Sequence, residues 1–489
     1  MTPVLFFFTL FLTDIQDPSR ILNRATNTLE WQKSISLKII ISNQLRLSDI
    51  PADLYSLLIE KLIIQNPKWL ENKKMGRWNR NTPKELKFYD KIGKDGLSIP
   101  RGYMRQLIYL CRSQDIPHEI EDRRLSLPEV DIQFSGHLKP FQIEAARKML
   151  SRDFGVLSAP TGSGKTVIAL FMIAQRRQPA LIVVHTKELA YQWMDRIHSF
   201  LAIPSDEIGL IGNGKMMIGE KITVALVQSL YKCSQDVSPK IGYLVVDESH
   251  RCPSRTFTDA VTDFSSRYMI GLSATPFRRD KLSQLIFWHL GDLHHQIEKE
   301  SLIQQGHILE ADVTFRETSF KSHFDPINQY TKMLSELTED KERNLLIASD
   351  IVNEIKELTG ICLVLSDRKA HCKNLQAILR YRFKTESTVL TGDTPAPERK
   401  EVLEQLHTGG IRILIATGQL IGEGFDCKEL STLFLATPIK FSGRLLQYIG
   451  RVMRIAPGKK KAKIVDYIDV NVDVLNAAAK SRQQIYNNG

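Results

Sequence analysis

The residues best suited to chemistry lie in one stretch, SAPTGSGKTVIAL, at positions 158–170. A glycine-rich turn between a strand and a helix directs backbone N–H groups at phosphate oxygens, and the positive end of the helix adds to the attraction. Lys165 would reach the β- and γ-phosphates, and the Thr166 hydroxyl would bind Mg²⁺. The usual pattern has glycine where this chain has Ala159, which costs little if φ stays negative there. We therefore predict a nucleoside triphosphate site; the alternative is an ordinary glycine-rich turn. The expected lining is Pro160, Thr161, Gly162, Ser163, Gly164, Lys165 and Thr166.

Two adjacent carboxylates follow a second apolar run, in IGYLVVDESH. At the end of a buried strand, Asp247 can hold Mg²⁺, directly or through water, and Glu248 can orient and deprotonate an attacking water. A solvated acidic turn would explain the two charges, but not their position after YLVV. The pair predicts hydrolysis of the bound nucleotide.

A third group of candidate residues lies in GRLLQYIGRVMR, where the pattern indicates a helix. Its spacing places Gln447, Arg451 and Arg454 on one helix face. Arginines that reach a γ-phosphate from a second domain stabilise transition-state charge, which is worth about 10³ to 10⁵ in rate. Gly450 weakens the helix by roughly 1 kcal/mol and so suggests a close approach to another element. The alternative is a basic helix face on the surface.

These side chains all follow apolar runs that alternate with helical stretches. Such alternation predicts a parallel sheet with helices on both faces, and ligands bind beyond the carboxyl ends of its strands. A second set of strands and helices, without the glycine-rich loop, begins near residue 360. The predicted fold class is α/β, with two parallel-sheet domains in tandem behind a small N-terminal α+β domain. The predicted organisation is an apolar segment over 1–30, a basic accessory domain over 31–128, a first parallel-sheet domain over 129–310, a connecting segment over 311–345, a second parallel-sheet domain over 346–475 and a tail over 476–489.

The composition is that of a globular protein with a polyanionic partner. Lys and Arg number 66 against 55 Asp and Glu, which gives a net charge of +11 and favours nucleic acid as the partner. The six cysteines form no C-x-x-C pair, so we expect no zinc or disulfide framework and a cytoplasmic location. The apolar run near the start is too short to cross a bilayer, so we expect no membrane partner.

The segment 61–112 is the most basic part of the chain, with thirteen Lys or Arg against four Asp or Glu. Basic side chains can follow phosphates while aromatic rings stack on exposed bases. We expect Arg77 and Trp78, which lie in a polar loop, to contact nucleic acid. The alternative is that the aromatic residues form the core of a small domain.

Eight motifs in order resemble those of superfamily 2 helicases of the DEAD/DEAH type: PTGSGKT, VVHTKEL, ALVQSL, DESH, SAT, LVLSDR, ATGQLIGEGFD and QYIGRVMR. The resemblance covers about residues 130 to 470. It implies two RecA-like domains with ATP and Mg²⁺ in the cleft between them, and it implies that Gln142 recognises adenine. It also implies that Gly424 and Asp426 serve the cleft. Ser273, Ala274 and Thr275 would couple the ATP state to the grip on nucleic acid.

Further residues of these motifs are expected to contact the nucleic acid. They are Thr186, Lys187, Gln228, Ser229, Ser366, Arg368 and Thr417.

Within the superfamily the chain is most similar to the XPB-like branch of DNA translocases and repair helicases. That branch often has Arg-Glu-Asp where this chain has Arg278, Arg279 and Asp280, so the glutamate is replaced. The chain is also similar to helicases joined to primase-like domains in bacterial conflict systems, although it has no primase-like motif of its own.

The expected activity is an ATP-dependent DNA helicase or double-stranded DNA translocase in repair, recombination or defence. Its ATPase would be stimulated by nucleic acid. We expect a monomer, with a primase or a nuclease as a candidate protein partner. The alternatives are an RNA helicase and an ATP-switched nucleic-acid sensor or scaffold.

Overall fold

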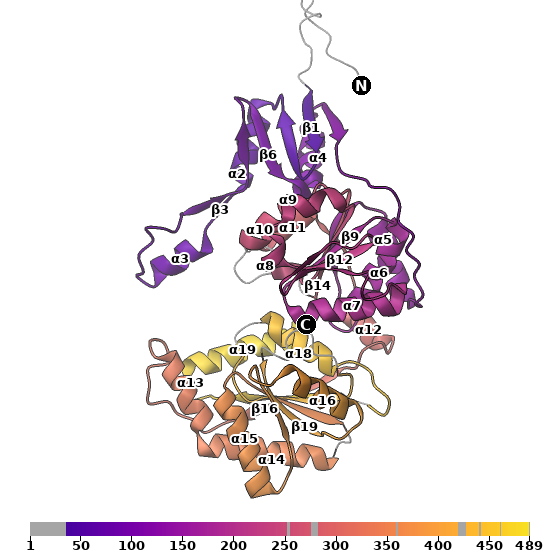
Figure 1. Cartoon of the computed structure of the whole chain (residues 1–489). Coiled ribbons are helices and arrows are strands. Elements are labelled where there is room, and N and C mark those ends of the chain that lie inside the picture. The colour runs from indigo at the N-terminus through magenta and orange to yellow at the C-terminus, as the bar shows by residue number, and fades with distance from the viewer. Residues whose placement is uncertain are drawn as a thin grey trace, which may run out of the picture. The chain divides into compact units, whose positions relative to one another are not determined.

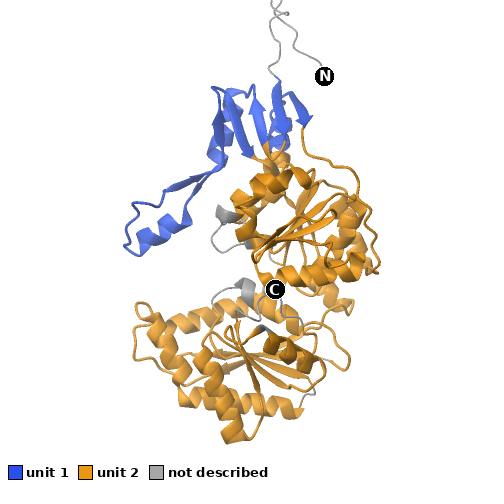
Figure 2. Ribbon diagram, in the orientation of Figure 1, with its two compact units in different colours: residues 1–41, 45–99, 106–122 blue, residues 42–44, 100–105, 123–489 orange. Residues whose placement is uncertain are grey.

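The computed structural model describes residues 36–251, 255–274, 282–357, 360–418, 427–439, 442–459 and 461–488. Within them the chain forms two compact units, which Figure 2 shows in different colours. Unit 1 comprises the described parts of Met1–Ile41, Leu45–Ile99 and Gln106–Asp122, and unit 2 comprises the described parts of Ser42–Gln44, Pro100–Arg105 and Arg123–Gly489. The predicted apolar segment over 1–30 lies outside the described residues.

Unit 1 is built on a five-stranded sheet in the order β5-β6-β2-β1-β7. Its strands are β1 (Leu37–Ile41), β2 (Gln44–Ser48), β5 (Asp90–Ile92), β6 (Gly96–Pro100) and β7 (His118–Asp122), and its helices include α2 (Ala52–Lys61) and α4 (Met104–Ser113). Buried and exposed residues alternate along β1 and β2, because successive side chains of a strand point to opposite faces. Leucines of the helices, such as Leu54, Leu58 and Leu107, are fully buried as well.

A slender extension, the basic arm, leaves this sheet at residues 63–87. It consists of the antiparallel pair β3 (Ile63–Gln65) and β4 (Glu85–Lys87) with α3 (Pro67–Lys74) between them, and Figure 1 shows it reaching away from the rest of unit 1. Asn66 fixes its base: the side-chain oxygen accepts a hydrogen bond from the Lys68 amide at 3.0 Å, and the side-chain nitrogen donates to the Pro83 carbonyl at 2.9 Å. All residues of α3 are at least partly exposed. The arm therefore presents both of its sides to solvent.

The first sheet of unit 2 has eight strands in the order β11-β10-β12-β9-β13-β14-β8-β15. β10 and β11 pair antiparallel, and the other described pairs are parallel. The strands are β8 (Phe154–Ser158), β9 (Ala180–Val184), β10 (Gly209–Gly212), β11 (Lys215–Met217), β12 (Ile222–Leu226), β13 (Tyr243–Val246), β14 (Tyr268–Ser273) and β15 (Leu293–Gln296).

Helices cover both faces of this sheet, as its continuous apolar strands require. On one face lie α5 (Pro140–Leu150), α6 (Lys165–Arg176) and α7 (Lys187–Leu201). On the other lie the short α8 (Val227–Leu230), α9 (Ser234–Val237), α10 (Arg255–Thr262) and α11 (Ser283–Leu290). Figure 1 shows the two groups of helices on either side of the strands. Parallel strands have their carboxyl ends at the same edge of the sheet. The predicted site residues of this domain follow strand ends at that edge.

The second sheet of unit 2 has six strands in the order β16-β21-β20-β17-β19-β18, and its described pairs are parallel. The strands are β16 (Ala311–Glu317), β17 (Ile361–Ser366), β18 (Thr388–Leu390), β19 (Ile413–Thr417), β20 (Leu430–Leu435) and β21 (Ala462–Ile468). Helices α14 (Lys341–Glu357) and α15 (Lys369–Phe383) cover one face, and α16 (Ala396–His407) and α18 (Ser442–Val452) the other.

The predicted connecting segment 311–345 supplies an edge strand of this sheet, because β16 pairs with β21 along its whole length. It also supplies α13 (Tyr330–Glu339), whose Met333 and Leu337 pack against Val472 and Leu475 near the start of α19 (Asp473–Asn488).

A buried ion pair fastens α14 to the residue that follows β21. The Arg343 guanidinium donates to Asp469 at 2.8 Å and to the Ala436 carbonyl at 2.7 Å, and both side chains of the pair are almost fully buried. Removing one partner of such a pair leaves an uncompensated buried charge, which costs about 3–5 kcal/mol.

Candidate nucleotide and nucleic-acid site

The glycine-rich loop joins β8 to α6, as its sequence indicates. Gly162 and Gly164 have φ values of 93° and 85°, which glycine adopts without the steric cost that other residues meet. Among the described residues, the non-glycine residues with positive φ do not include Ala159. Alanine therefore meets no backbone strain at the position where the usual pattern has glycine. The Ala159 amide donates to the Ser273 carbonyl at 2.9 Å, which ties the start of the loop to the end of β14.

Lys165 occupies the first position of α6 and folds back over the loop. Its ammonium donates to the Ala159 carbonyl at 2.9 Å and to the Pro160 carbonyl at 3.4 Å. Burial lowers the pKa of Lys165, while the carboxylates of Glu248 and Asp247 act to raise it. The guanidinium groups of Arg454 and Arg451 are close enough to lower it further. A partly buried ammonium held by two neutral carbonyls is well placed to turn to an anion.

The loop also contains a buried hydroxyl group that fits a phosphate. Ser163 is 2% exposed, and its hydroxyl has no hydrogen-bond partner among the described residues. A buried donor without a partner costs about 1–3 kcal/mol, so a ligand oxygen at this position would stabilise it. This observation supports the fit of a nucleotide independently of the motif.

Gln142, in the first turn of α5, contacts the loop directly. Its side-chain nitrogen donates to the Ser163 carbonyl at 2.8 Å, and its side-chain oxygen accepts from the Lys139 amide at 2.9 Å. A β-carbon at Gly164 would lie 2.4 Å from the Gln142 nitrogen and would displace the end of that side chain, while the φ of Gly164 is the stronger reason for glycine here. The structure thus places Gln142 as a support of the loop, and adenine recognition by this residue stays a prediction.

Asp247 follows β13, and its carboxylate is held from two sides. One oxygen accepts from the Trp193 ring nitrogen at 2.8 Å, and the other accepts from the Glu248 amide at 2.8 Å. Burial and the neighbouring Glu248 raise the pKa of Asp247 to about 6, although the Trp193 bond and Lys165 oppose the rise. Trp193 was missed by reasoning from sequence, because a tryptophan at an apolar position of α7 gives no sign that its N–H reaches a catalytic carboxylate.

Glu248 has a left-handed backbone with φ of 50°, a conformation that is uncommon for residues other than glycine. Its carboxylate lies 3.2 Å from His250 Nδ1, and the same nitrogen lies 3.4 Å from the Ser273 hydroxyl. A short chain of polar contacts therefore joins the predicted base to the predicted coupling segment. Ala274 is described and half-buried, whereas Thr275 lies outside the described residues.

The predicted finger residues lie on or just after α18, within unit 2. Gln447 and Arg451 are buried and Arg454 is half-buried. A β-carbon at Gly450 would lie 2.3 Å from the Thr161 β-carbon, and one at Gly162 would lie 3.4 Å from Arg454 Cγ. The close approach that Gly450 suggested is present, and its partner is the phosphate-binding loop.

Lys459 is a second residue that sequence reasoning missed. Its ammonium donates to the carbonyl of Val452, to that of Arg454 at 2.7 Å and to that of Lys428 at 3.3 Å. It thereby holds the C-terminal end of α18 against the chain that leads into β20. A cation is favourable at this end of a helix because the helix dipole is negative there.

Most of the predicted nucleic-acid contacts lie just beyond the carboxyl ends of parallel strands. Thr186 follows β9 and accepts from the Leu189 amide at 3.3 Å as the N-cap of α7, and Lys187 donates to Asn213 at 2.6 Å. Gln228 and Ser229 follow β12, Arg368 follows β17 and Thr417 ends β19. Gln228 is exposed, and Ser229, Arg368 and Thr417 are partly exposed. These positions are compatible with the predicted contacts, which stay predictions.

Ser366 does not fit that pattern. It is 1% exposed, and its hydroxyl is 2.9 Å from His371 Nδ1 and accepts from the Arg368 amide at 3.1 Å. The side chain therefore belongs to the interior of the second sheet's domain, and the structure does not support a side-chain contact to nucleic acid at this position.

Trp78 lies in the basic arm and is 82% exposed, with the Arg80 guanidinium 5.6 Å from the ring centroid. The alternative in which it forms the core of a small domain is therefore wrong. Arg77 is also exposed.

Gly424, Asp426 and the triplet over 278–280 lie outside the described residues.

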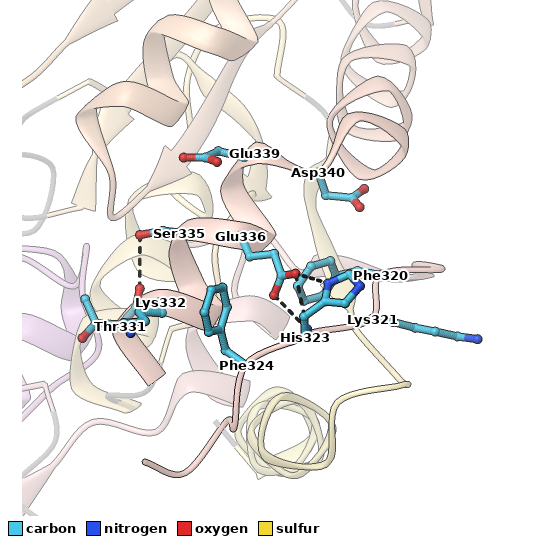
Figure 3. Close-up of a pocket in the computed structure, with 10 residues that line it drawn as sticks. All are labelled: Phe320, Lys321, His323, Phe324, Thr331, Lys332, Ser335, Glu336, Glu339 and Asp340. Carbon is cyan, nitrogen blue, oxygen red and sulfur yellow. Dashed lines mark hydrogen bonds and ion pairs between the residues drawn. The ribbon is translucent and has the colours of Figure 1, made fainter. Parts of the chain in front are cut away.

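An open pocket of about 540 Å³ lies on the second sheet's domain. Figure 3 shows the His323 and Glu336 side chains directed at each other within it. The Ser322 hydroxyl also donates to Glu336, at 2.9 Å. The lining is Phe320, Lys321, His323, Phe324, Thr331, Lys332, Ser335, Glu336, Glu339 and Asp340.

Within the described part of the chain, no helix is long and apolar enough to span a membrane.

Comparison with family models matches both halves of unit 2. Residues 135–278 match the model described as type III restriction enzyme, res subunit, and residues 346–456 match the helicase conserved C-terminal domain. The chain is 26% identical over 369 residues to the DNA 3'-5' translocase XPB2 of Sulfurisphaera tokodaii, covering 69% of this chain and 83% of that protein. It is 25% identical over 372 residues to L396 of Acanthamoeba polyphaga mimivirus, which its name places among ATP-dependent RNA helicases, covering 73% of this chain and 69% of that protein.

A solved structure shares the fold. Saccharomyces cerevisiae Dbp5 bound to RNA and ADP BeF3 aligns with a TM-score of 0.51 at 15% identity, over 72% of this chain and 88% of that one. The predicted pair of RecA-like domains is confirmed, with the small N-terminal domain before them. The chain therefore has the two helicase domains of a superfamily 2 ATPase/helicase, and proteins of the XPB-like branch are among its relatives.

Proposed function

We propose that the protein is an ATP-dependent DNA helicase or double-stranded DNA translocase that uses Mg²⁺ and acts in repair, recombination or defence. The observation that carries the proposal is the convergence of charge on Lys165. Two carboxylates and two arginines, from both motor halves, act on this one partly buried ammonium. Such a cluster around a phosphate-binding loop has the composition needed to bind and hydrolyse a nucleoside triphosphate.

The loop would bind the phosphates. We expect Lys165 to leave the Ala159 and Pro160 carbonyls and pair with the β- and γ-phosphates, while the loop amides and the Ser163 hydroxyl bond their oxygens. Gln142 would hold the loop in shape through Ser163. Thr166 and Asp247 would hold Mg²⁺, which neutralises charge on the phosphate oxygens.

Glu248 would orient the attacking water and accept its proton. The hydrogen bonds from the Trp193 and Glu248 N–H groups lower the pKa of Asp247 and so favour its ionised form, which leaves Glu248 to take up the proton. Arg451 and Arg454 would stabilise the charge that develops on the γ-phosphate, and Gln447 would support them from the same helix.

Coupling of hydrolysis to nucleic acid would run through Ser273. This residue accepts from the loop amide of Ala159 through its backbone and contacts His250 through its hydroxyl. Binding or loss of the γ-phosphate can therefore affect the end of β14 in two ways, through the Ala159 amide and through His250. Ala274 and Thr275 follow directly in the sequence.

The basic arm supports nucleic acid as the substrate, and XPB2 supports DNA. The arm carries seven Lys or Arg against two Asp or Glu, and it presents Trp78 to solvent. Cations and an exposed aromatic ring together favour a single strand or a frayed duplex end. The name of L396 supports the alternative, an RNA substrate.

We assign domain roles accordingly. The basic accessory domain over 31–128 would bind DNA, and the motor domains over 129–310 and 346–475 would form the ATP cleft. We propose that the protein acts as a monomer; light scattering with and without DNA tests this assignment. A primase or nuclease partner stays a hypothesis that pull-down with tagged protein can test.

The decisive experiment is an ATPase titration with duplex DNA, forked DNA, single-stranded DNA and RNA of matched sequence. We expect DNA to stimulate turnover more than RNA does, and Lys165→Ala to abolish turnover with every ligand. Lys148→Ala, at an exposed lysine of α5, is the matched control and should behave as wild type. Stronger stimulation by RNA would replace the DNA assignment. Nucleotide binding without turnover would favour the sensor or scaffold alternative.

A further inference from the structure

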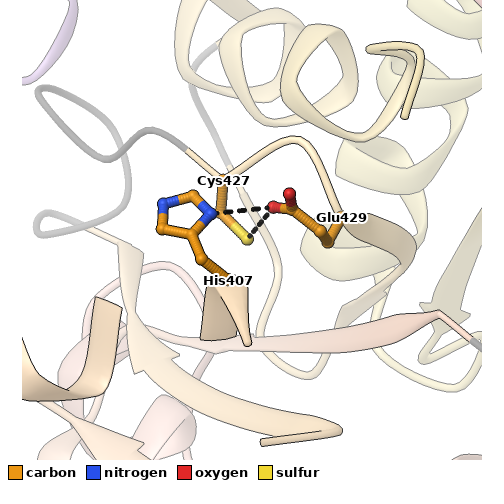
Figure 4. Close-up of side chains that lie close together, drawn as sticks. All are labelled: His407, Cys427 and Glu429. Atoms are coloured by element: carbon orange, nitrogen blue, oxygen red, sulfur yellow. Dashed lines mark hydrogen bonds and ion pairs between the residues drawn. The ribbon is translucent and has the colours of Figure 1, made fainter. Parts of the chain in front are cut away.

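Three side chains of metal-ligand type converge on the second sheet's domain, outside the predicted ATP site. His407 ends α16, while Cys427 and Glu429 lie just before β20. Their ligand atoms, the His407 Nδ1, the Cys427 Sγ and a Glu429 oxygen, all lie within 4.8 Å of one another, and Figure 4 shows the three side chains directed at a common point. The sequence separates His407 from Cys427 by twenty positions. A search for short cysteine and histidine motifs therefore misses the group.

We propose that His407, Cys427 and Glu429 form a binding site for Zn²⁺ or a similar divalent transition-metal ion. Zinc accepts this mixture of ligands and prefers a tetrahedral arrangement. With metal–ligand distances of about 2.0–2.3 Å, tetrahedral geometry places the ligand atoms about 3.3–3.6 Å apart. In the structure Cys427 Sγ is 3.3 Å and His407 Nδ1 is 3.2 Å from the same Glu429 oxygen. Two of the three ligand spacings are thus already close to what the ion requires, and the third, between Cys427 and His407, is at most 4.8 Å.

The same distances also suit hydrogen bonds. The alternative to a metal site is therefore a hydrogen-bonded group of the three side chains without an ion. The Cys427 thiol can donate to Glu429, and so can a protonated His407. Both bonds involve protons that an ion would displace, so the two states exclude each other. An experiment that detects a metal–sulfur bond separates them directly.

The site is expected to exchange its ion. Three protein ligands leave the fourth tetrahedral position to water, unlike the four-ligand sites that serve only structure. The His407 side chain is 50% exposed, which gives the ion a path from solvent. The Lys459 ammonium donates to the carbonyl of Lys428, which lies between Cys427 and Glu429 in the sequence. Its positive charge will reduce the affinity of the site for a cation.

Binding would have a consequence for the motor. Cys427 directly follows Asp426 in the sequence, and Lys428 is tied through Lys459 to the end of α18. An ion at the site would restrain the chain between the predicted cleft residues and the predicted finger helix. This consequence rests on the proposed function, whereas the binding itself does not.

The test is a Co²⁺ titration of the full chain, because cobalt in a tetrahedral thiolate site gives a sulfur-to-cobalt charge-transfer band in the near ultraviolet. We expect one Co²⁺ per chain with this band, and its loss when Zn²⁺ is added. Cys427→Ser should remove the band. His407→Gln should weaken binding more than about 100-fold, since loss of even an outer partner of a metal ligand costs 10–100-fold.

Two matched controls show that the loss is specific. His198→Gln alters an exposed histidine in the last turn of α7, and Cys233→Ser alters a half-buried cysteine of the first sheet's domain. Both should titrate as wild type. Because Cys427 is buried and its variant can fail to fold, the exposed His407 variant keeps the test decisive when circular dichroism shows a native fold.

Absence of the band in wild type at saturating Co²⁺, or equal binding by the His407 variant, would overturn the proposal in favour of the hydrogen-bonded group. ATPase activity measured in the same samples is a separate readout. If the wild-type protein shows the cobalt band but has no ATPase activity, the result would count against the proposed function and would still support the metal site.

Discussion

Gly450 offers the sharpest test of the proposed site, because one added methyl group should separate α18 from the phosphate-binding loop. In Gly450→Ala the new β-carbon would lie 2.3 Å from the Thr161 β-carbon. Non-bonded carbons prefer about 3.5–4.0 Å, so the two elements must separate by roughly 1–2 Å. A misplacement of about 1 Å at catalytic groups can cost about 100-fold in rate. We therefore expect kcat to fall by about 100-fold.

Stability should change much less than kcat. Alanine is favoured over glycine in a helix interior by about 1 kcal/mol, which offsets part of the roughly 1–3 kcal/mol that overpacking costs, so the melting temperature should fall by a few degrees at most. The assay is DNA-stimulated ATPase with melting temperature measured on the same preparation. Gly392→Ala is the matched control, since no atom lies within 4 Å of its new β-carbon. A kcat within threefold of wild type would refute the reasoning that Arg451 and Arg454 act from this helix on the loop.

The remaining predictions concern the hydrogen bond from Trp193 to Asp247, the exposed basic arm and the buried His371. Trp193→Phe removes the N–H that Asp247 accepts; because a hydrogen bond to a charged group is worth about 1.5–3 kcal/mol, the Mg²⁺ concentration needed for half-maximal ATPase should rise at least tenfold, and an unchanged Mg²⁺ curve would contradict this. Arg77→Ala with Trp78→Ala should cost about 1–3 kcal/mol in DNA affinity and flatten the plot of log affinity against log salt by about one unit, with the melting temperature unchanged because Trp78 is exposed; an unchanged salt slope would argue against the arm. Burial lowers the pKa of His371 to about 3 from the ordinary 6.5, so the unfolded chain binds a proton that the folded chain does not, and stability falls as pH falls through this window. His371→Gln should reduce that slope by at most about 1.4 kcal/mol per pH unit, which urea unfolding at a series of pH values measures; an equal slope in wild type and variant would exclude His371 as a cause.

Local patterns were sufficient for the elements that surround the nucleotide site. The strand, the glycine-rich turn and the helix around Lys165 lie within about twenty residues, and each has its own sequence signal. Asp247 and Glu248 follow an apolar strand in the same way. The fold class followed from the alternation of such units, and the family followed from the order of their motifs.

Contacts between distant residues could not be predicted in this way. Trp193 and Asp247 are 54 positions apart, and only the pairing of β9 with β13 brings their elements together. Lys459 reaches back to Lys428, and His407 meets Cys427 and Glu429 across the end of a helix. The burial of Ser366 could not be predicted for a related reason: a polar residue at a strand end can turn inward, and the Ser366 hydroxyl lies 2.9 Å from Nδ1 of the buried His371.

The order of strands in the second sheet also constrains when this domain can form during synthesis. β21 lies between β16 and β20, although it is made after every other strand of the sheet. Until the ribosome has passed it, β16 has no neighbour and Arg343 has no Asp469 to neutralise it. The domain is therefore expected to complete its core late, with α14 and the apolar face of β20 exposed in the nascent chain. Chaperone binding and proteolysis should be concentrated in that interval, and a ribosome-bound chain stalled before residue 462 should be cleaved readily where the longer chain resists.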